Sequence, residues 1–275
     1  MAGSRWGPAI GGWMVSLPLI SGPVVFFLAL DQGASFAAEA ARGSCAGNAA
    51  LAVCFLAYAR VARRAHWQGA LAAATLGWAI AAIALQPALA WPVGAVFVVV
   101  VAVILVALRM MPAGTGHPSA AAAPRWEVPL RMAVGTTVVV VLTAAAPLLG
   151  PGLSGLLAML PVITLVLSVC THRREGVENA TGFLRGDLAG LIGTAAFLAV
   201  VGGSIEQLGV AASFGAAVVA TVVIQGLTLR ALRTRTASLG EISTSREQAE
   251  PDSQRHNVDE DGKLERAAHA RDPRH

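Results

Sequence analysis

Two prolines, Pro18 and Pro161, each lie close to the middle of a long apolar segment. A proline inside a helix removes one backbone hydrogen bond and frees a carbonyl, so the helix is interrupted or bent there. Ser21 and Gly22 follow the first proline, and Thr164 follows the second. In membrane proteins a matched pair of interrupted helices indicates a solute-binding site at the middle of the bilayer. The open alternative is a pair of packing kinks whose freed carbonyls are satisfied by neighbours or hydroxyl groups.

Few other polar side chains stand in the apolar segments. Asn48 and Gln225 are costly to place in lipid, so we expect them to contact another helix or line a binding site. The threonines are expected to bond their own helix; they are Thr136, Thr137, Thr143, Thr194 and Thr221. We expect no Asp, Glu, Lys, Arg or His in the middle of any apolar segment, which argues against a buried proton relay.

The composition indicates a membrane protein. Of 275 residues, 55% are hydrophobic and only 13% charged, and the mean hydropathy is +0.64. These values lie outside the range of soluble domains. The apolar segments are continuous and lack the alternation of a transmembrane β-barrel. The sequence therefore predicts an all-α, polytopic helical membrane protein with about eight spans, at 10–30, 44–59, 67–85, 88–108, 130–150, 153–171, 187–203 and 207–229.

One block of sequence occurs twice, at 8–52 and at 151–195, with a constant offset of 143 residues and no gap. Alanine and leucine coincidences mean little in so apolar a chain, so the match rests on proline, glycine and arginine. The matched pairs include Pro8/Pro151, Gly12/Gly155, Pro18/Pro161, Gly33/Gly176, Arg42/Arg185, Gly43/Gly186 and Gly47/Gly190. A duplicated unit predicts two similar halves.

The arginines predict the orientation of these halves. With eight spans, 13 of the 14 arginines in residues 1–235 fall on one side, which the positive-inside bias makes cytoplasmic. The second copy begins five crossings after the first, so the two copies point in opposite directions. This is an inverted-topology repeat, which many secondary transporters share.

Arg42 is the exception to the orientation bias. It falls in a predicted loop, 31–43, on the side that otherwise lacks arginine, and the repeat retains it as Arg185. Each arginine either caps helix carbonyls or binds lipid headgroups, or the two form a pseudo-symmetric pair of anion contacts or gates.

The chain divides into four parts: a first membrane half (1–109), a cytoplasmic linker (110–129), a second membrane half (130–235) and a tail (236–275). The tail carries six basic and nine acidic residues and almost no large apolar ones. It cannot bury enough surface to fold alone, so we expect a disordered cytoplasmic tail.

The densest charged cluster of the body is a predicted loop, 171–179, in which His172, Glu175 and Glu178 have the residue types of a metal or acid–base site. The simpler account is a solvated cytoplasmic loop. The three cysteines are separated and form no ligand motif, and no nucleophile, zinc or phosphate-binding motif occurs. We therefore expect no enzyme activity, cofactor, metal or nucleic-acid partner.

Around 155–186 the chain resembles the GlpM-like family of small bacterial inner-membrane proteins. The resemblance rests on Gly155-Leu156, Pro161, Leu165, Gly176-Val177-Glu178 and Gly186. Members are single short units linked to alginate production, whereas this chain carries two units, and its first copy has Ser35 where the second has Glu178. The resemblance implies a fusion of two units that would otherwise pair antiparallel.

Two functions fit the sequence. The leading interpretation is a secondary transporter or permease for a small solute, bound between the segments 10–30 and 153–171. The alternative is a non-transporting scaffold or accessory subunit of an envelope polysaccharide or lipid system. In either case we expect a bacterial cytoplasmic (inner) membrane protein with both termini cytoplasmic, partnered by the lipid bilayer and, as a further expectation, by a second copy in a homodimer.

Overall fold

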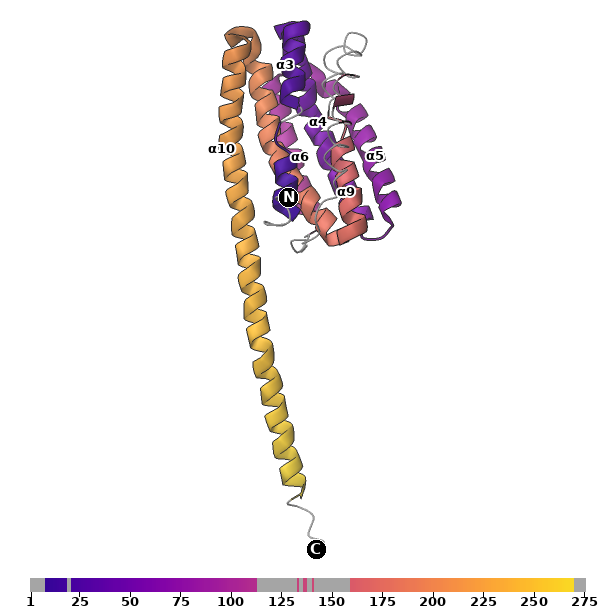
Figure 1. The fold of residues 1–275 in the computed structure, drawn as a ribbon, viewed down its shortest axis with the longest axis vertical. Helices are drawn as coiled ribbons and strands as arrows, with labels where there is room; N and C mark the ends of the chain where they lie inside the picture. The colour runs from indigo at the N-terminus through magenta and orange to yellow at the C-terminus, as the bar shows by residue number, and fades with distance from the viewer. Residues whose placement is uncertain are drawn as a thin grey trace. The chain divides into compact units, whose positions relative to one another are not determined.

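The computed structural model describes residues 8–18, 21–112, 133, 136–137, 140 and 159–269, with side chains up to Arg230. All regular elements in these ranges are helices, and none of these residues lies in a strand. The chain divides into two units, Met1–Leu229 and Arg230–His275. The helices, coloured along the chain in Figure 1, are α2 (Pro8–Val15), α3 (Ser21–Asp31), α4 (Ala34–Val61), α5 (Trp67–Ala84), the 3-10 turn η1 (Gln86–Ala90), α6 (Val93–Met110), α9 (Val162–Glu175) and α10 (Val177–His269).

Four of the described helices are long and apolar enough to cross a membrane: α4, α5, α6 and the part of α10 from Val177 to Arg230. The outer faces of α5 and α6 are also apolar. Ile80 and Ile83 are 67% and 72% exposed, and Val98 is 66% exposed. Large apolar side chains at such exposure fit a hydrocarbon environment. The chain is therefore compatible with an integral membrane protein of the all-helical class.

Helix α4 is the most buried of the four spans. It runs antiparallel to the first part of α10: its start lies beside Gly202, and the Cys45 thiol approaches the Ala195 carbonyl at 3.7 Å. A β-carbon added at Gly202 would lie 3.2 Å from the Ala38 carbonyl oxygen. Small residues therefore let the two backbones approach closely, as is typical of helix pairs in lipid.

Helix α10 is interrupted at Gly209, which has φ 76° and ψ 173°. Glycine adopts this conformation without the steric cost that a β-carbon would bring. The chain reverses there (Figure 1), and the two arms pack antiparallel, with the rings of Phe197 and Phe214 5.7 Å apart. We refer to Val177–208 as the first arm of α10 and to 210–229 as its second arm.

Several predicted boundaries are wrong. The predicted segment 10–30 is two helices, α2 and α3, while α4 begins ten residues before the predicted start at 44. The predicted loops 31–43, 171–179 and 202–207 are mostly helical, with single turn residues at Gly33 and Gly176. Hydropathy detects apolar surface, whereas alanine-rich polar stretches such as 34–43 form helix through intrinsic propensity. The predicted span 130–150 and most of the linker 110–129 lie outside the described residues, apart from helical residues at 133, 136–137 and 140.

The unit from Arg230 begins close to the predicted tail boundary at 236. Its backbone is helical as far as His269, and the disordered tail stays a prediction. Alanine, glutamate, arginine and leucine recur in this stretch, and all four favour helix without requiring a core.

The two copies of the repeated block agree in local geometry. Gly33 (φ 92°, ψ 170°) precedes α4, and Gly176 (φ 88°, ψ 174°) precedes α10. After each proline the same backbone hydrogen bond forms, from Gly22 to Pro18 at 3.0 Å and from Leu165 to Pro161 at 2.8 Å. Because α4 and the first arm of α10 are antiparallel, these two glycines lie at opposite ends of the pair.

Candidate functional site

The interruption between α2 and α3 carries a buried polar network. The Ser16 hydroxyl donates to the Trp13 carbonyl at 2.6 Å, and the Thr194 hydroxyl of α10 donates to the Ser16 carbonyl. Both Ser16 and Thr194 are 5% exposed. Hydroxyl groups therefore satisfy the carbonyls that the break leaves free. This is the arrangement expected if the interruption is a packing kink and not a solute-binding site. One of these hydroxyls comes from a distant helix, so the break is also tied to α10.

The second arm of α10 completes the network. Gln225, 3% exposed, donates from Nε2 to the Gly190 carbonyl at 3.0 Å. The Thr228 hydroxyl lies 3.0 Å from the Gln225 carbonyl and accepts a hydrogen bond from Trp13 Nε1 at 3.1 Å. The prediction that Gln225 contacts another helix is confirmed. Its amide lies at a junction of α2 and both arms of α10.

Three glycines let α2 approach the first arm of α10 closely. A β-carbon at Gly12 would overlap the Phe183 carbonyl, and one at Gly186 would overlap the Ala9 carbonyl. A β-carbon at Gly190 would meet the Ser16 hydroxyl. All three glycines belong to the matched pairs of the repeated block, and all three lie where α2 packs against the first arm of α10.

Asp187 is the polar residue that the sequence prediction missed. It is 2% exposed and accepts a hydrogen bond from the Thr164 hydroxyl at 3.0 Å. From the sequence we expected no acid in the middle of an apolar segment, and the predicted span began at 187, whereas α10 begins ten residues earlier and holds Asp187 inside the helix. Asp187 is the first residue of that predicted span, so the sequence pattern did not mark it as a residue inside an apolar segment.

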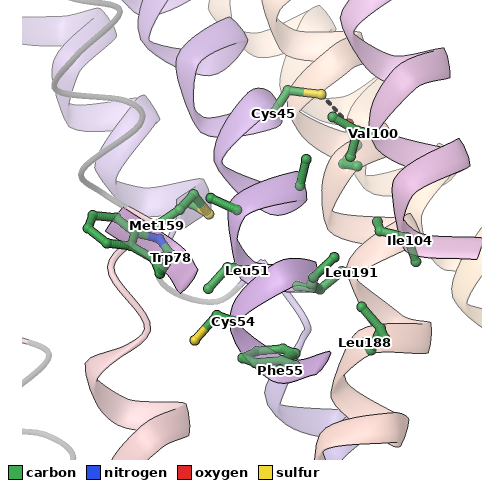
Figure 2. Close-up of a cluster of buried hydrophobic side chains, with 14 of the residues drawn as sticks. Cys45, Leu51, Cys54, Phe55, Trp78, Val100, Ile104, Met159, Leu188 and Leu191 are labelled. Carbon is green, nitrogen blue, oxygen red and sulfur yellow. Dashed lines mark hydrogen bonds between the residues drawn. The ribbon is translucent and has the colours of Figure 1, made fainter. Parts of the chain in front are cut away.

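Asp187, Gly190 and Thr194 share one face of α10, because they are spaced by three and four residues. We call this face the polar stripe. It meets both proline-marked segments: Ser16 before Pro18, and Thr164 after Pro161. The side of the same arm next to the polar stripe is apolar. Figure 2 shows Leu188 and Leu191 beside Phe55 of α4 in the buried cluster.

Ser21 and Gly22 are buried at the start of α3, and a β-carbon at Gly22 would lie 3.5 Å from the ring of Phe197. Asn48 is 0% exposed, but its amide nitrogen donates to the Ser44 carbonyl of its own helix at 3.2 Å. Among the described residues its Oδ1 has no hydrogen-bond donor. The hydrogen bond of Asn48 therefore does not join it to the polar stripe.

The two matched arginines have different surroundings. Arg185 donates to the Met111 carbonyl at 3.0 Å, just beyond the end of α6, and Arg60 donates to the Met110 carbonyl at 3.1 Å. Cations at a helix C-terminus satisfy free carbonyls and complement the helix dipole, which fits the capping alternative for Arg185. Arg42 lies within α4, so its prediction as a loop residue is wrong. Its Nε is buried without a hydrogen-bond acceptor among the described residues.

Comparison with protein-family models, with curated proteins and with solved structures finds no match for this chain. The site therefore rests on its own geometry.

A cluster of basic residues marks one end of the bundle. Arg63 pairs with Glu178 at 3.4 Å and joins the end of α4 to the start of α10. Arg173 stacks over Trp67 at 5.4 Å and joins the end of α9 to the start of α5.

His172 belongs to the predicted charged cluster at 171–179, and its Nδ1 lies 3.2 Å from the Tyr58 hydroxyl. Burial lowers the pKa of His172, and the nearby His66 lowers it further. Among the described residues no three His, Cys, Asp or Glu side chains are placed to hold a metal ion.

Proposed function

We propose that this chain is a membrane transporter or permease for a small polar solute, bound where the two proline-marked segments meet the polar stripe of α10. A single observation carries the proposal. Ser16, beside the first proline, and Thr164, after the second, both hydrogen-bond to one face of the same helix. Discontinuous helices that converge on one buried polar surface are how secondary transporters build a binding site.

The arrangement of the repeat supports the same proposal. Gly33 and Gly176, equivalent in sequence and alike in conformation, lie at opposite ends of an antiparallel helix pair. That is the relation expected of an inverted repeat with two halves that exchange roles. The basic end defined by Arg63 and Arg173 would then face the cytoplasm of a bacterial inner membrane.

Cysteine accessibility tests the pathway. In a protein whose native cysteines are replaced by alanine, Ser21→Cys and Thr164→Cys are expected to react with a charged, membrane-impermeant thiol reagent applied to membrane vesicles of either orientation. The residues lie on the two proline-marked helices, α3 and α9, and a solvated pathway would expose both. Ile80→Cys on the apolar outer face is the matched control and is expected to stay unreactive, because lipid excludes the reagent. Unreactive cysteines at both positions, from either side, would refute the pathway.

A second function is favoured by the satisfied carbonyls at the interruption, since a break closed by Ser16 and Thr194 hydroxyls needs no solute. This is the scaffold or accessory subunit of an envelope polysaccharide or lipid system. Under it, deleting residues from 236 onward would abolish an envelope phenotype, while Pro18→Ala and Pro161→Ala would leave it intact. Transport predicts the reverse pattern.

A further inference from the structure

The most unusual side chain in the first unit is an acid within an apolar helix. Asp187 lies in the first arm of α10 and is 2% exposed. A charged carboxylate without water is very costly unless a cation or several hydrogen bonds compensate for it. Among the described residues its one hydrogen-bond donor is Thr164, and no basic side chain forms an ion pair with it.

We infer that Asp187 and Thr164 form a proton-binding site, and that proton uptake by this carboxylate is coupled to the solute transport proposed above. In this step the carboxylate of Asp187 binds one proton from water and becomes the neutral carboxylic acid. No further reactant is needed. The coupling part of the inference rests on the proposed function, whereas the proton site stands without it.

Thr164 suits both states of the acid. Its hydroxyl donates to the carboxylate at 3.0 Å, and a hydroxyl can equally accept a hydrogen bond from a protonated acid. Thr164 lies in the first turn of α9, directly after Pro161, and Ser168 in the next turn donates to the Thr164 carbonyl at 2.7 Å. The partner of the acid therefore belongs to one of the two proline-marked helices.

The surroundings of Asp187 favour a proton over a metal cation. From α4, the Cys54 thiol lies close enough to interact electrostatically with the acid. Helix α2 contributes the close approach of Gly12 and no titratable group, and the second arm of α10 has none between 210 and 229. On α9, the titratable side chains are Cys170 and those from His172 onward, and His172 lies about 12 Å along the helix from Thr164. One carboxylate and one hydroxyl are too few oxygens for a bare cation such as sodium.

The first copy of the repeat indicates that the fold does not require this acid. The position aligned with Asp187 is Ser44, which is 1% exposed, and the position aligned with Thr164 is Ser21, which is 6% exposed. A small neutral hydroxyl therefore fills the equivalent buried place in α4. Only the second copy has an acid at this position. Asp187→Ser, which introduces the residue found in the first copy, is therefore the variant best suited to test its role.

Labelling with dicyclohexylcarbodiimide tests the proton site, because this apolar reagent modifies carboxylic acids in their protonated form. In full-length protein in phospholipid vesicles, peptide mass spectrometry is expected to find the label on Asp187. The rate should fall about tenfold per pH unit above the titration midpoint of the acid. Asp187→Ser should abolish the label, and the exposed Glu39 and Glu206 should remain unlabelled as internal controls. Thr164→Val should keep the label to higher pH, because the carboxylate loses its donor.

The infrared carbonyl band of a protonated carboxylic acid gives an independent readout. It should be present in the wild-type protein near neutral pH and missing in Asp187→Ser. Absence of both the label and the band, in a protein that Asp187→Ser leaves equally well folded, would overturn the proton site.

A last measurement separates the coupling from the proposed function. The labelling rate of Ser21→Cys is divided at each pH by the rate of a small free thiol, because thiol reactivity itself rises with pH. This ratio should change with pH when Asp187 is present and should stay constant when Asp187 is replaced by serine. A measurable ratio that is constant in both proteins overturns the coupling and leaves the pathway standing. No reaction of Ser21→Cys or of Thr164→Cys at any pH refutes the pathway itself, whatever the carbodiimide result.

Discussion

Gly186→Ala is expected to lower the free energy of unfolding by about 1–3 kcal/mol, although alanine is intrinsically the better helix residue. The added β-carbon would overlap the carbonyl of Ala9, which is part of the backbone of α2. Backbone cannot rotate away as a side chain can, so α2 must move off α10. The measurement is thermal unfolding in detergent micelles, followed by tryptophan fluorescence.

The chain offers a matched control at Gly215. This glycine also lies in α10, but a β-carbon there would meet no atom within 4 Å. Gly215→Ala should therefore raise stability by about 0.5–1 kcal/mol, the ordinary gain of alanine over glycine in a helix. Gly190→Ala should fall between the two, because its closest neighbour is the rotatable Ser16 hydroxyl. Equal changes at Gly186 and Gly215 would contradict the close packing of α2 on α10.

Proline and glycine were the most informative residues in the sequence, because their effects are local. Pro18 and Pro161 mark helix starts or breaks in both copies, and Gly33 and Gly176 mark turns with positive φ. A residue that restricts or frees its own backbone acts without regard to distant partners. The all-helical class with apolar helices of membrane-spanning length could be predicted for a similar reason, since it depends on the composition of each segment alone.

Boundaries and partners could not be predicted in this way. Hydropathy missed the first ten residues of both α4 and the first arm of α10, which are helical and carry Glu39, Arg42 and Arg185. Asp187 and Thr164 are 23 residues apart, and no periodicity in the sequence connects them. Their contact depends on how two helices pack, which is a property of the whole fold. The predicted span 187–203 consequently began at this acid without identifying it as buried.

Thr194→Val is the second large effect that we expect, with a loss of about 1–3 kcal/mol in the free energy of unfolding. Valine nearly preserves the shape of threonine but removes the hydroxyl that donates to the Ser16 carbonyl. That carbonyl lies in the turn after α2, outside a regular helix. A buried acceptor without a donor retains its full desolvation cost. Thermal unfolding in micelles again provides the measurement.

Thr221→Val is the control, because sequence alone does not distinguish these two threonines. Both lie in α10 and both are 5% exposed, yet the Thr221 hydroxyl donates to Ala217 within its own helix at 2.7 Å. The Ala217 carbonyl remains inside a regular helix after the substitution, so the change should stay within about 0.5 kcal/mol. Equal losses would mean that Thr194 does not hold the interruption. A loss confined to Thr194→Val would mean that the break at Pro18 is held from α10, so any opening of this site must first separate α2 from the polar stripe.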